Sequence, residues 1–151
     1  MAKAREVLDE LLVNVFNRIN TIEGITLKKR GVKLSITEIH ILDAIAKCEE
    51  ATMSNVAKKL LVTVGSLTIA VDTLVNKGLV VRGSSENDRR KVILILTDKA
   101  TEPLKVHSEF HDEMITKVIS DMNLTDDSEL INSLENLMVY FREKHELIKN
   151  S

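Results

Sequence analysis

Residues 53–96 restrict the possible folds of this chain more than any other segment. Their apolar spacing and β-branched runs predict two short helices, a two-residue turn between them, and two strands joined by a polar loop. The helices cover 53–60 and 63–76, and the strands cover 79–82 and 92–96. Thr63 is a typical N-cap for the second helix. Two short helices followed by a hairpin with a polar tip form a helix-turn-helix with a wing.

Four longer helical segments flank this motif, and apolar residues recur in each at steps of three and four. The second opens with a capping box, in which the Ser35 hydroxyl is expected to accept from the Glu38 amide. The predicted segments are 7–22, 35–47, 103–122 and 128–148. One proline and five glycines leave little room for a loop-rich or all-β architecture. The predicted fold class is therefore mainly α, an α+β winged helix.

Composition excludes several classes of protein. Hydrophobic residues make up 44% of the chain, which is enough for a core, yet no run of about 18 apolar residues predicts a membrane span. The N-terminus leads directly into an amphipathic pattern, and the single cysteine, Cys48, rules out an internal disulfide. We expect a cytoplasmic protein that does not bind membranes. The chain has no nucleophile elbow, dinucleotide-binding glycine loop, P-loop or C-x-x-C motif, so we expect no enzymatic activity and no cofactor.

Charge is divided unevenly along the chain although the net value is only −2. Residues 1–100 carry 16 Lys and Arg against 12 Asp and Glu, whereas residues 101–151 carry 5 against 11. A basic surface is therefore expected in the first part, and an acidic helical scaffold in the second.

The helix-turn-helix region resembles the MarR family of transcriptional regulators. The resemblance rests on the stretches Met53–Leu60, Val64–Thr68, Leu74–Val80, Asn87–Arg90 and Leu96–Thr97. The Asp-x-Arg at residues 88–90, followed by a strand that ends in Leu-Thr, is its most specific part. The flanking helices extend the likeness to nearly all of residues 1–151, read as one domain with the winged region at 35–99 and dimerisation helices at 1–30 and 101–150.

The resemblance implies binding to double-stranded DNA through the helix that begins after Thr63. Leu67, Val71 and Leu74 fall on one face of that helix and are expected to hold it onto the domain. Toward the groove, hydroxyls are expected to contact base edges or phosphates and methyl groups to contact thymine methyls. The wing arginine of the family, which enters the minor groove, corresponds to Arg90, with Asp88 orienting it or bracing the turn. The predicted DNA-contacting residues are Ser66, Thr68, Ile69, Lys58, Lys59, Lys77, Arg82, Asp88, Arg89 and Arg90. A hairpin that is simply solvated is the alternative.

The apolar faces of the first and the last two long helices exceed what a small winged domain can cover. The family pairs these helices in a two-fold dimer, and a homodimer would place two recognition helices on a pseudo-palindromic operator. Burial within a single chain is the alternative.

Two hypotheses concern an effector. The first rests on four segments, Val15–Ile19, Glu38–His40, Val64–Thr68 and His107–His111. They look like the branch of the family that represses fatty-acid biosynthesis genes (the FabT type), which implies an acyl chain, presented on acyl carrier protein, as corepressor. The residues proposed to line its pocket are Phe16, Ile19, Ile39, Phe110 and Met114. A nearby basic cluster is expected to attract the acidic carrier protein, and it consists of Lys28, Lys29, Arg30 and Lys33.

The second hypothesis is a metal site. His107 and His111 are spaced i, i+4, which places both on one helix face at metal-ligand spacing. Glu23 and His40 would join them if the helices that carry them cross this one, and a zinc-sensing branch of the family uses a similar set. A hydrogen-bonded pair of core histidines is the alternative.

Two rival functions remain. One is a zinc- or small-ligand-responsive regulator of other genes, and the other is an adaptor that binds proteins instead of DNA. Cys48 is followed by two glutamates, which disfavour a thiolate, so a structural cysteine is expected.

Overall fold

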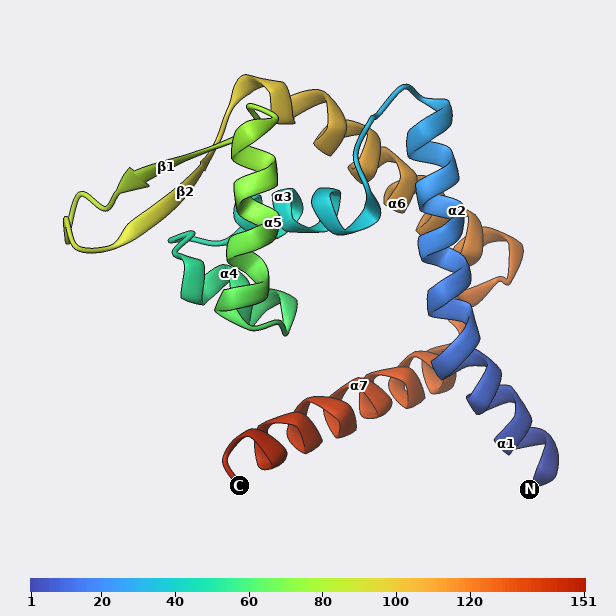
Figure 1. Ribbon diagram of the computed structural model, residues 1–151. Coiled ribbons are helices and arrows are strands. Elements are labelled where there is room, and N and C mark those ends of the chain that lie inside the picture. The colour runs from blue at the N-terminus through green and yellow to red at the C-terminus, as the bar shows by residue number, and fades with distance from the viewer. The chain divides into compact units, whose positions relative to one another are not determined.

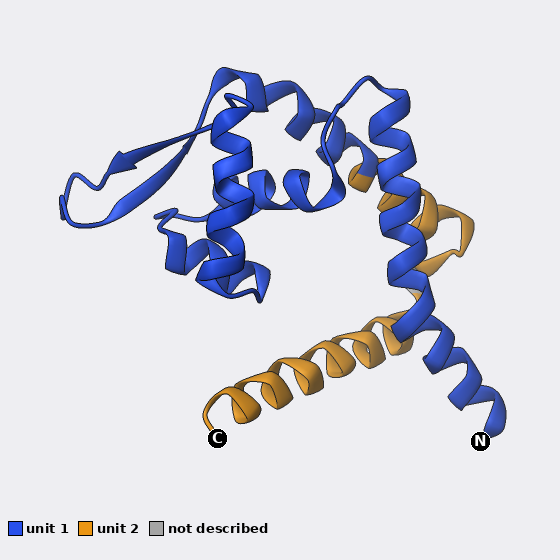
Figure 2. Ribbon diagram, in the orientation of Figure 1, with its two compact units in different colours: residues 1–110 blue, residues 111–151 orange. Residues whose placement is uncertain are grey.

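The computed structural model describes residues 1–151, apart from the side chain of Asp126. It divides into two compact units, residues 1–110 and 111–151 (Figure 2). In chain order the first unit contains α1 (Ala2–Asp9), the π-helical turn η1 (Glu10–Val15), α2 (Phe16–Lys29), α3 (Ile36–Lys47), α4 (Met53–Leu60), α5 (Val64–Asn76), β1 (Val80–Ser84), β2 (Val92–Leu96), the 3-10 turn η2 (Asp98–Ala100) and the first half of α6 (Thr101–Asp121) (Figure 1). The second contains the rest of α6, the 3-10 turn η3 (Leu124–Asp126) and α7 (Ser128–Lys149). The predicted mainly α winged-helix class is confirmed.

The N-terminal helix differs from its prediction in one respect. The apolar stripe predicts a single regular helix, whereas the structure inserts the π turn η1 between α1 and α2. A π turn holds more residues than an α turn, so it rotates the apolar stripe that follows it. Periodicity alone does not reveal such an insertion, because the steps of three and four persist on both sides.

Side-chain caps fix where the central helices begin. The Ser35 hydroxyl accepts from the Glu38 amide at 3.1 Å, and the Glu38 carboxylate accepts from the Ser35 amide at 2.8 Å. This is the capping box that the sequence predicts. Thr63 Oγ1 accepts from the Ser66 amide at 3.2 Å, so Thr63 is the N-cap of α5 as expected. Each cap satisfies a helix N–H that would otherwise lack an intrahelical partner.

The wing is an antiparallel hairpin of β1 and β2 in which Val80 pairs with Leu96. The first strand begins at Val80, one residue later than predicted. Leu79 instead closes α5, because its amide donates to the Leu74 carbonyl at 3.0 Å and its side chain is buried. Gly78 adopts a positive φ of 76° just before it, which is the usual way for a glycine to end a helix.

The core of the first unit lies where α3, α4, α5 and the base of the hairpin meet. Leu67, Val71 and Leu74 on α5 are almost fully buried, as the sequence predicts for the face that anchors this helix. They pack with apolar side chains of α3 and α4, among them Leu42 and Val56. Burial of one face leaves the opposite face of α5 exposed.

The second unit is rich in exposed apolar side chains. In the described structure none of the residues of α7 is buried. Ile131, Leu134, Met138 and Phe141 recur at steps of three and four, and their exposed fractions run from 37% to 60%. No single helix among the described residues is long and apolar enough to cross a membrane; only α4 and α5 taken together pass that test, and they are bent by 107°.

Candidate nucleic-acid interface and metal centre

The exposed face of α5 carries the three residues predicted to meet DNA bases. Ser66, Thr68 and Ile69 are all exposed, and Ile69 is 73% exposed. All three lie in the N-terminal half of the helix, which is the part of a recognition helix that meets base edges. Because the opposite face of α5 is buried against the core, these three residues point away from the protein.

Four basic residues predicted to contact phosphates fall into two groups. Lys58 and Lys59 lie in the last turn of α4 and are exposed. Lys77 and Arg82 are instead engaged within the protein. The Lys77 ammonium lies 2.7 Å from Glu38 on α3, and the Arg82 guanidinium donates to the Asp72 carboxylate on α5.

The Lys77 pair ties the C-terminal end of α5 to the N-terminal end of α3. Burial raises the pKa of the Glu38 carboxyl, but the hydrogen bond and charge of Lys77, together with hydrogen bonds from Ser35, outweigh burial and hold that pKa below its ordinary value. A lowered carboxyl pKa stabilises the folded state above the ordinary carboxyl pKa. This contribution is lost as the pH falls through the lowered value.

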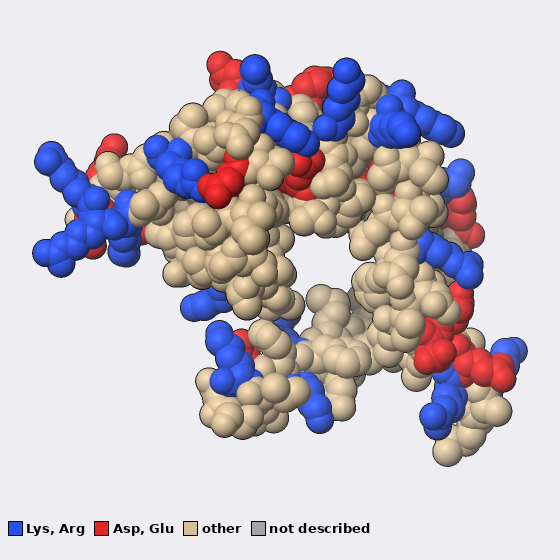
Figure 3. All heavy atoms as spheres, viewed as in Figure 1, with Lys and Arg blue, Asp and Glu red and all other residues tan. Residues whose placement is uncertain are grey.

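The wing tip is basic and braced from within. Arg89 and Arg90 are exposed there, and Lys and Arg side chains gather at the far end of the β1–β2 hairpin in Figure 3. The Asp88 carboxylate accepts from the Arg90 amide at 2.9 Å, and the Asp88 carbonyl accepts from the Lys91 amide at 3.1 Å. Of the two roles expected for Asp88, the structure shows bracing of the turn.

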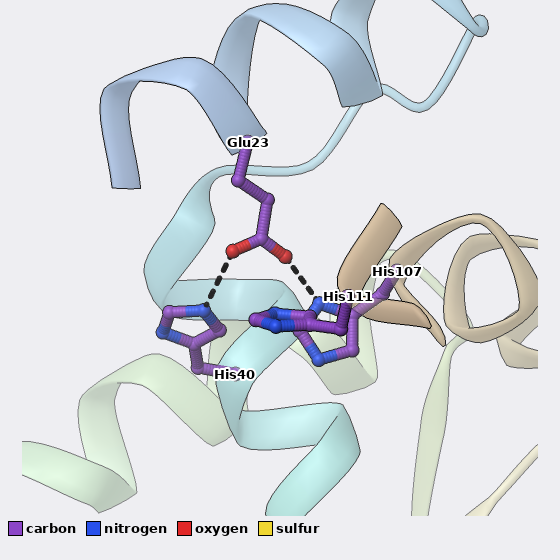
Figure 4. A group of neighbouring side chains, drawn as sticks. All are labelled: Glu23, His40, His107 and His111. Atoms are coloured by element: carbon purple, nitrogen blue, oxygen red, sulfur yellow. Dashed lines mark hydrogen bonds and ion pairs between the residues drawn. The ribbon is translucent and has the colours of Figure 1, made fainter. Parts of the chain in front are cut away.

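A buried polar cluster lies where α2, α3 and α6 meet. Glu23 of α2 is fully buried, and its two carboxylate oxygens face two imidazoles (Figure 4). Glu23 Oε2 lies 3.2 Å from His40 Nε2 on α3, and Glu23 Oε1 is hydrogen-bonded to His107 Nδ1 on α6. The His40 and His107 rings meet edge to face, with their centroids 5.6 Å apart.

His111 completes the predicted set. It lies one turn after His107 on α6, which runs unbroken from Thr101 to Asp121, so this helix determines its position. One ligand atom from each of Glu23, His40, His107 and His111 lies within 4.8 Å of the others. Three imidazoles and one carboxylate form a donor set typical of a zinc site.

Asp43 is a neighbour of this cluster that sequence reasoning missed. Its Oδ1 lies 3.8 Å from His107 Nε2, the ring nitrogen that faces away from Glu23, and its Oδ2 lies 2.8 Å from Lys47 Nζ. The available signal was its spacing, because Asp43 follows His40 by three residues and so shares its helix face.

The residues predicted to line an acyl pocket have very different environments. Phe16 is 59% exposed, Ile19 is half-buried, and Ile39 and Phe110 are buried. Met114 belongs to the second unit. In the neighbouring basic cluster, Arg30 is engaged by Glu109 at 3.3 Å.

Comparison with known proteins places the chain in a family. Residues 34–92 match the model of the MarR family. The transcriptional regulator ZitR of Lactococcus lactis subsp. cremoris is 32% identical over 86 residues, which is 57% of this chain and 59% of that regulator. The chain thus spans about three fifths of the curated relatives it matches.

Solved structures extend the similarity to almost the whole chain. The crystal structure of Streptococcus pneumoniae FabT in complex with DNA is 34% identical, with a TM-score of 0.82, and the match covers 92% of this chain and 98% of FabT. A cysteine-to-serine mutant of Escherichia coli MarR, complexed with operator DNA, is 25% identical with a TM-score of 0.69, covering 89% of this chain and 92% of MarR. With a family model matching its winged region and a 34% identical relative covered almost completely, this chain belongs to the MarR family.

Proposed function

We propose that this protein is a DNA-binding transcriptional repressor whose affinity for its operator is set by a zinc ion held by Glu23, His40, His107 and His111. The buried cluster of these four residues is the observation that carries the metal part of the proposal. DNA binding is supported by the exposed N-terminal half of α5, the basic wing tip, and the likeness to two regulators solved with DNA.

Some of the proposed DNA contacts position the protein on the duplex, and others read its sequence. Lys58 and Lys59 are placed to hold phosphates, and Arg89 and Arg90 at the wing tip to meet the backbone or the minor groove. Arg82 is bound to Asp72, so it would have to release this carboxylate before it could contact a phosphate. A shift of DNA mobility with fragments from upstream of the protein's own gene tests this part, and its absence with every genomic fragment would favour an adaptor.

Arg90→Ala is expected to weaken specific DNA binding by about 1–3 kcal/mol, because a groove contact is lost from a braced turn. Fluorescence anisotropy at fixed salt measures the change. Lys117→Ala, which removes one positive charge from an exposed position on α6, is the matched control and should leave the affinity nearly unchanged. Equal affinities for the two variants would remove Arg90 from the interface.

The cluster fits a zinc ion in both chemistry and size. Zinc bound by four N and O ligands at about 2.0–2.1 Å keeps those ligands about 3.3 Å apart in a tetrahedron. The donor atoms here lie within 4.8 Å of one another, so a modest contraction would complete the site. A carboxylate as deeply buried as Glu23 also needs positive charge nearby, and the ion would supply it.

The position of the cluster suggests how zinc would act on DNA binding. The ligands come from α2, α3 and α6, so a bound ion would fix these helices relative to one another. α3 is the link to the DNA-binding face, because Glu38, two residues before His40, binds Lys77 at the end of α5. Fixing α3 would reduce the freedom that α5 must lose when it enters the major groove.

Asp43→Asn is expected to lower zinc affinity about 10- to 100-fold, the usual effect of removing a carboxylate that orients a ligating imidazole. Asp43 is placed to favour a proton on His107 Nε2, which leaves Nδ1 free to bind metal. Competition with a zinc-binding dye measures the affinity. Lys47→Met is the control, because it removes the other partner of Asp43 without touching His107; an equal loss in both variants would assign Asp43 a purely structural role.

A homodimer is the proposed assembly. The exposed apolar stripe of α7, with further exposed apolar residues on α1, supports it, because contiguous apolar surface of this kind marks an interface. A two-fold dimer would place two copies of α5 on a pseudo-palindromic operator, with half-sites about one helical turn apart.

Acyl control is the second candidate, and the similarity to FabT over 92% of the chain favours it. In that case long-chain acyl carrier protein would tighten operator binding, and Lys28→Glu would remove the effect. Zinc titration in the same assay separates the two candidates. Sensitivity to zinc alone would reject acyl control, and sensitivity to acyl carrier protein alone would reject the metal.

A further inference from the structure

The base-reading end of α5 lacks the side chains that usually read DNA by paired hydrogen bonds. Arg and Lys read guanine, and Asn and Gln read adenine. α5 contains no Arg, Lys or Gln, and its one asparagine, Asn76, is its last residue. Sequence-specific binding through this helix therefore needs another chemistry.

The threonine hydroxyls of this helix already donate to its own backbone. Thr68 Oγ1 donates to the Val64 carbonyl at 2.8 Å, and Thr73 Oγ1 donates to the Ile69 carbonyl at 3.4 Å. Ser66 Oγ accepts from the capping hydroxyl of Thr63 at 3.0 Å. With its hydroxyl turned back to the helix, Thr68 offers DNA chiefly its methyl group.

The one acidic group on this face is also engaged. Asp72 lies one turn after Thr68, and a free carboxylate there could accept from cytosine. Arg82 binds it instead. The apolar part of the exposed face remains available, and it includes Gly65, Ile69 and the methyl group of Thr68.

Gly65 and Ile69 differ sharply in how far their side chains project from that face of the helix. Ile69 is the most exposed large apolar side chain of α5. Gly65, one turn earlier, has no side chain, and a Cβ built there would meet nothing closer than Thr63 Oγ1 at 4.0 Å. Its φ is not positive, so neither packing nor backbone conformation requires a glycine, although glycine destabilises a helix relative to alanine. Nothing in the fold therefore requires a residue without a side chain at position 65.

We propose that Gly65 and Ile69, a recess and a ridge one helical turn apart on α5, read the C5 methyl group of thymine in the major groove. Thymine is the only base that presents a methyl group there, and apolar contact is how proteins recognise it. The absence of a side chain at Gly65 lets the helix approach the base edge, and Ile69 and the Thr68 methyl cover the thymine methyl from water. The proposal rests on DNA binding as the proposed function and adds what the helix recognises.

The direct test replaces thymine by deoxyuridine, which removes only the methyl group. A high-affinity duplex is first selected from a random DNA pool with the full-length wild-type protein. Each thymine of the selected half-sites is then replaced in turn, and affinity is measured by anisotropy at fixed salt. We expect one thymine per half-site whose replacement costs about four-fold, and about 15-fold when both half-sites are changed, as for the loss of one and two buried methyl groups.

Two variants assign the methyl contact to this pair. Ile69→Ala should bind the thymine and uracil duplexes equally, because the ridge that senses the methyl is gone. Gly65→Ala should fold with equal or higher thermal stability yet bind the selected duplex at least ten-fold more weakly, because the recess is filled. Thr73→Ala, exposed one turn after Ile69 toward the C-terminal end of the helix and so farther from the base-reading end, is the control and should keep the wild-type preference.

The outcomes distinguish a failure of the proposed DNA binding from a failure of methyl readout. Selection of no duplex at all contradicts the proposed DNA-binding function. Selection of a duplex whose thymines can all be replaced without loss contradicts methyl readout alone, as does a Gly65→Ala variant that binds like wild type. Loss of the thymine preference in Ile69→Ala, with the control unchanged, supports the recess-and-ridge pair.

Discussion

Glu23→Gln and His111→Ala are each expected to reduce zinc affinity by about 100- to 1,000-fold. Structural zinc sites bind with about 10–16 kcal/mol in total, so one of four ligands accounts for roughly 3 kcal/mol. Glu23→Gln keeps the shape and hydrogen-bonding capacity of the buried side chain but removes its charge. Two variants are needed because Glu23 is fully buried whereas His111 is only half-buried.

The chain offers a matched control for this experiment. His145 on α7 is the one histidine outside the cluster, and its side chain is 50% exposed. His145→Ala should bind zinc like the wild type. Circular dichroism shows whether each variant folds, and calorimetric titration with zinc, alongside magnesium as a hard cation that this donor set disfavours, measures affinity. Wild-type affinity in both cluster variants would reject the site.

Leu134→Glu and Phe141→Glu are expected to convert the protein from dimer to monomer or to aggregates. Both residues lie on the exposed apolar stripe of α7, and a buried charge without a partner strongly disfavours an interface. Subunits of an obligate dimer often have no stable monomeric fold, so loss of dimer and loss of stability should accompany each other. Sedimentation velocity at micromolar concentration measures the assembly.

Asn136→Glu is the control for this second experiment. It adds the same charge to the same helix, but Asn136 lies on the face opposite Leu134, and it is exposed. We expect it to leave the dimer intact. A wild-type protein that sediments as a stable monomer would reject the dimer and, with it, the pseudo-palindromic operator.

Features that depend on neighbouring residues in the chain were predictable from sequence. The Ser35 capping box, the Thr63 cap and the burial of Leu67 and Val71 all follow from local spacing, and the structure confirms them. The wing was recognisable for the same reason, since β-branched runs and a polar turn are local signals.

Features that depend on pairing between distant elements were not predictable. Lys77 and Arg82 were expected to meet phosphates because they are basic and flank the recognition helix. Their engagement by Glu38 and Asp72 arises only when α3, α5 and β1 come together. Asp43 was missed because its role depends on the position of His107, which is 64 residues away in the chain. A local pattern identifies what a residue can do, and tertiary structure decides which partner it meets.

The most direct test of the account measures operator affinity as a function of free zinc. The full-length protein is titrated into a labelled duplex, selected as above, first with a zinc chelator and then at buffered zinc concentrations. We expect zinc to tighten binding by about 5- to 150-fold, the usual range for coupling between two sites, and expect Glu23→Gln to remove this effect while still binding DNA. Equal operator affinity with chelator and with saturating zinc would contradict the central claim.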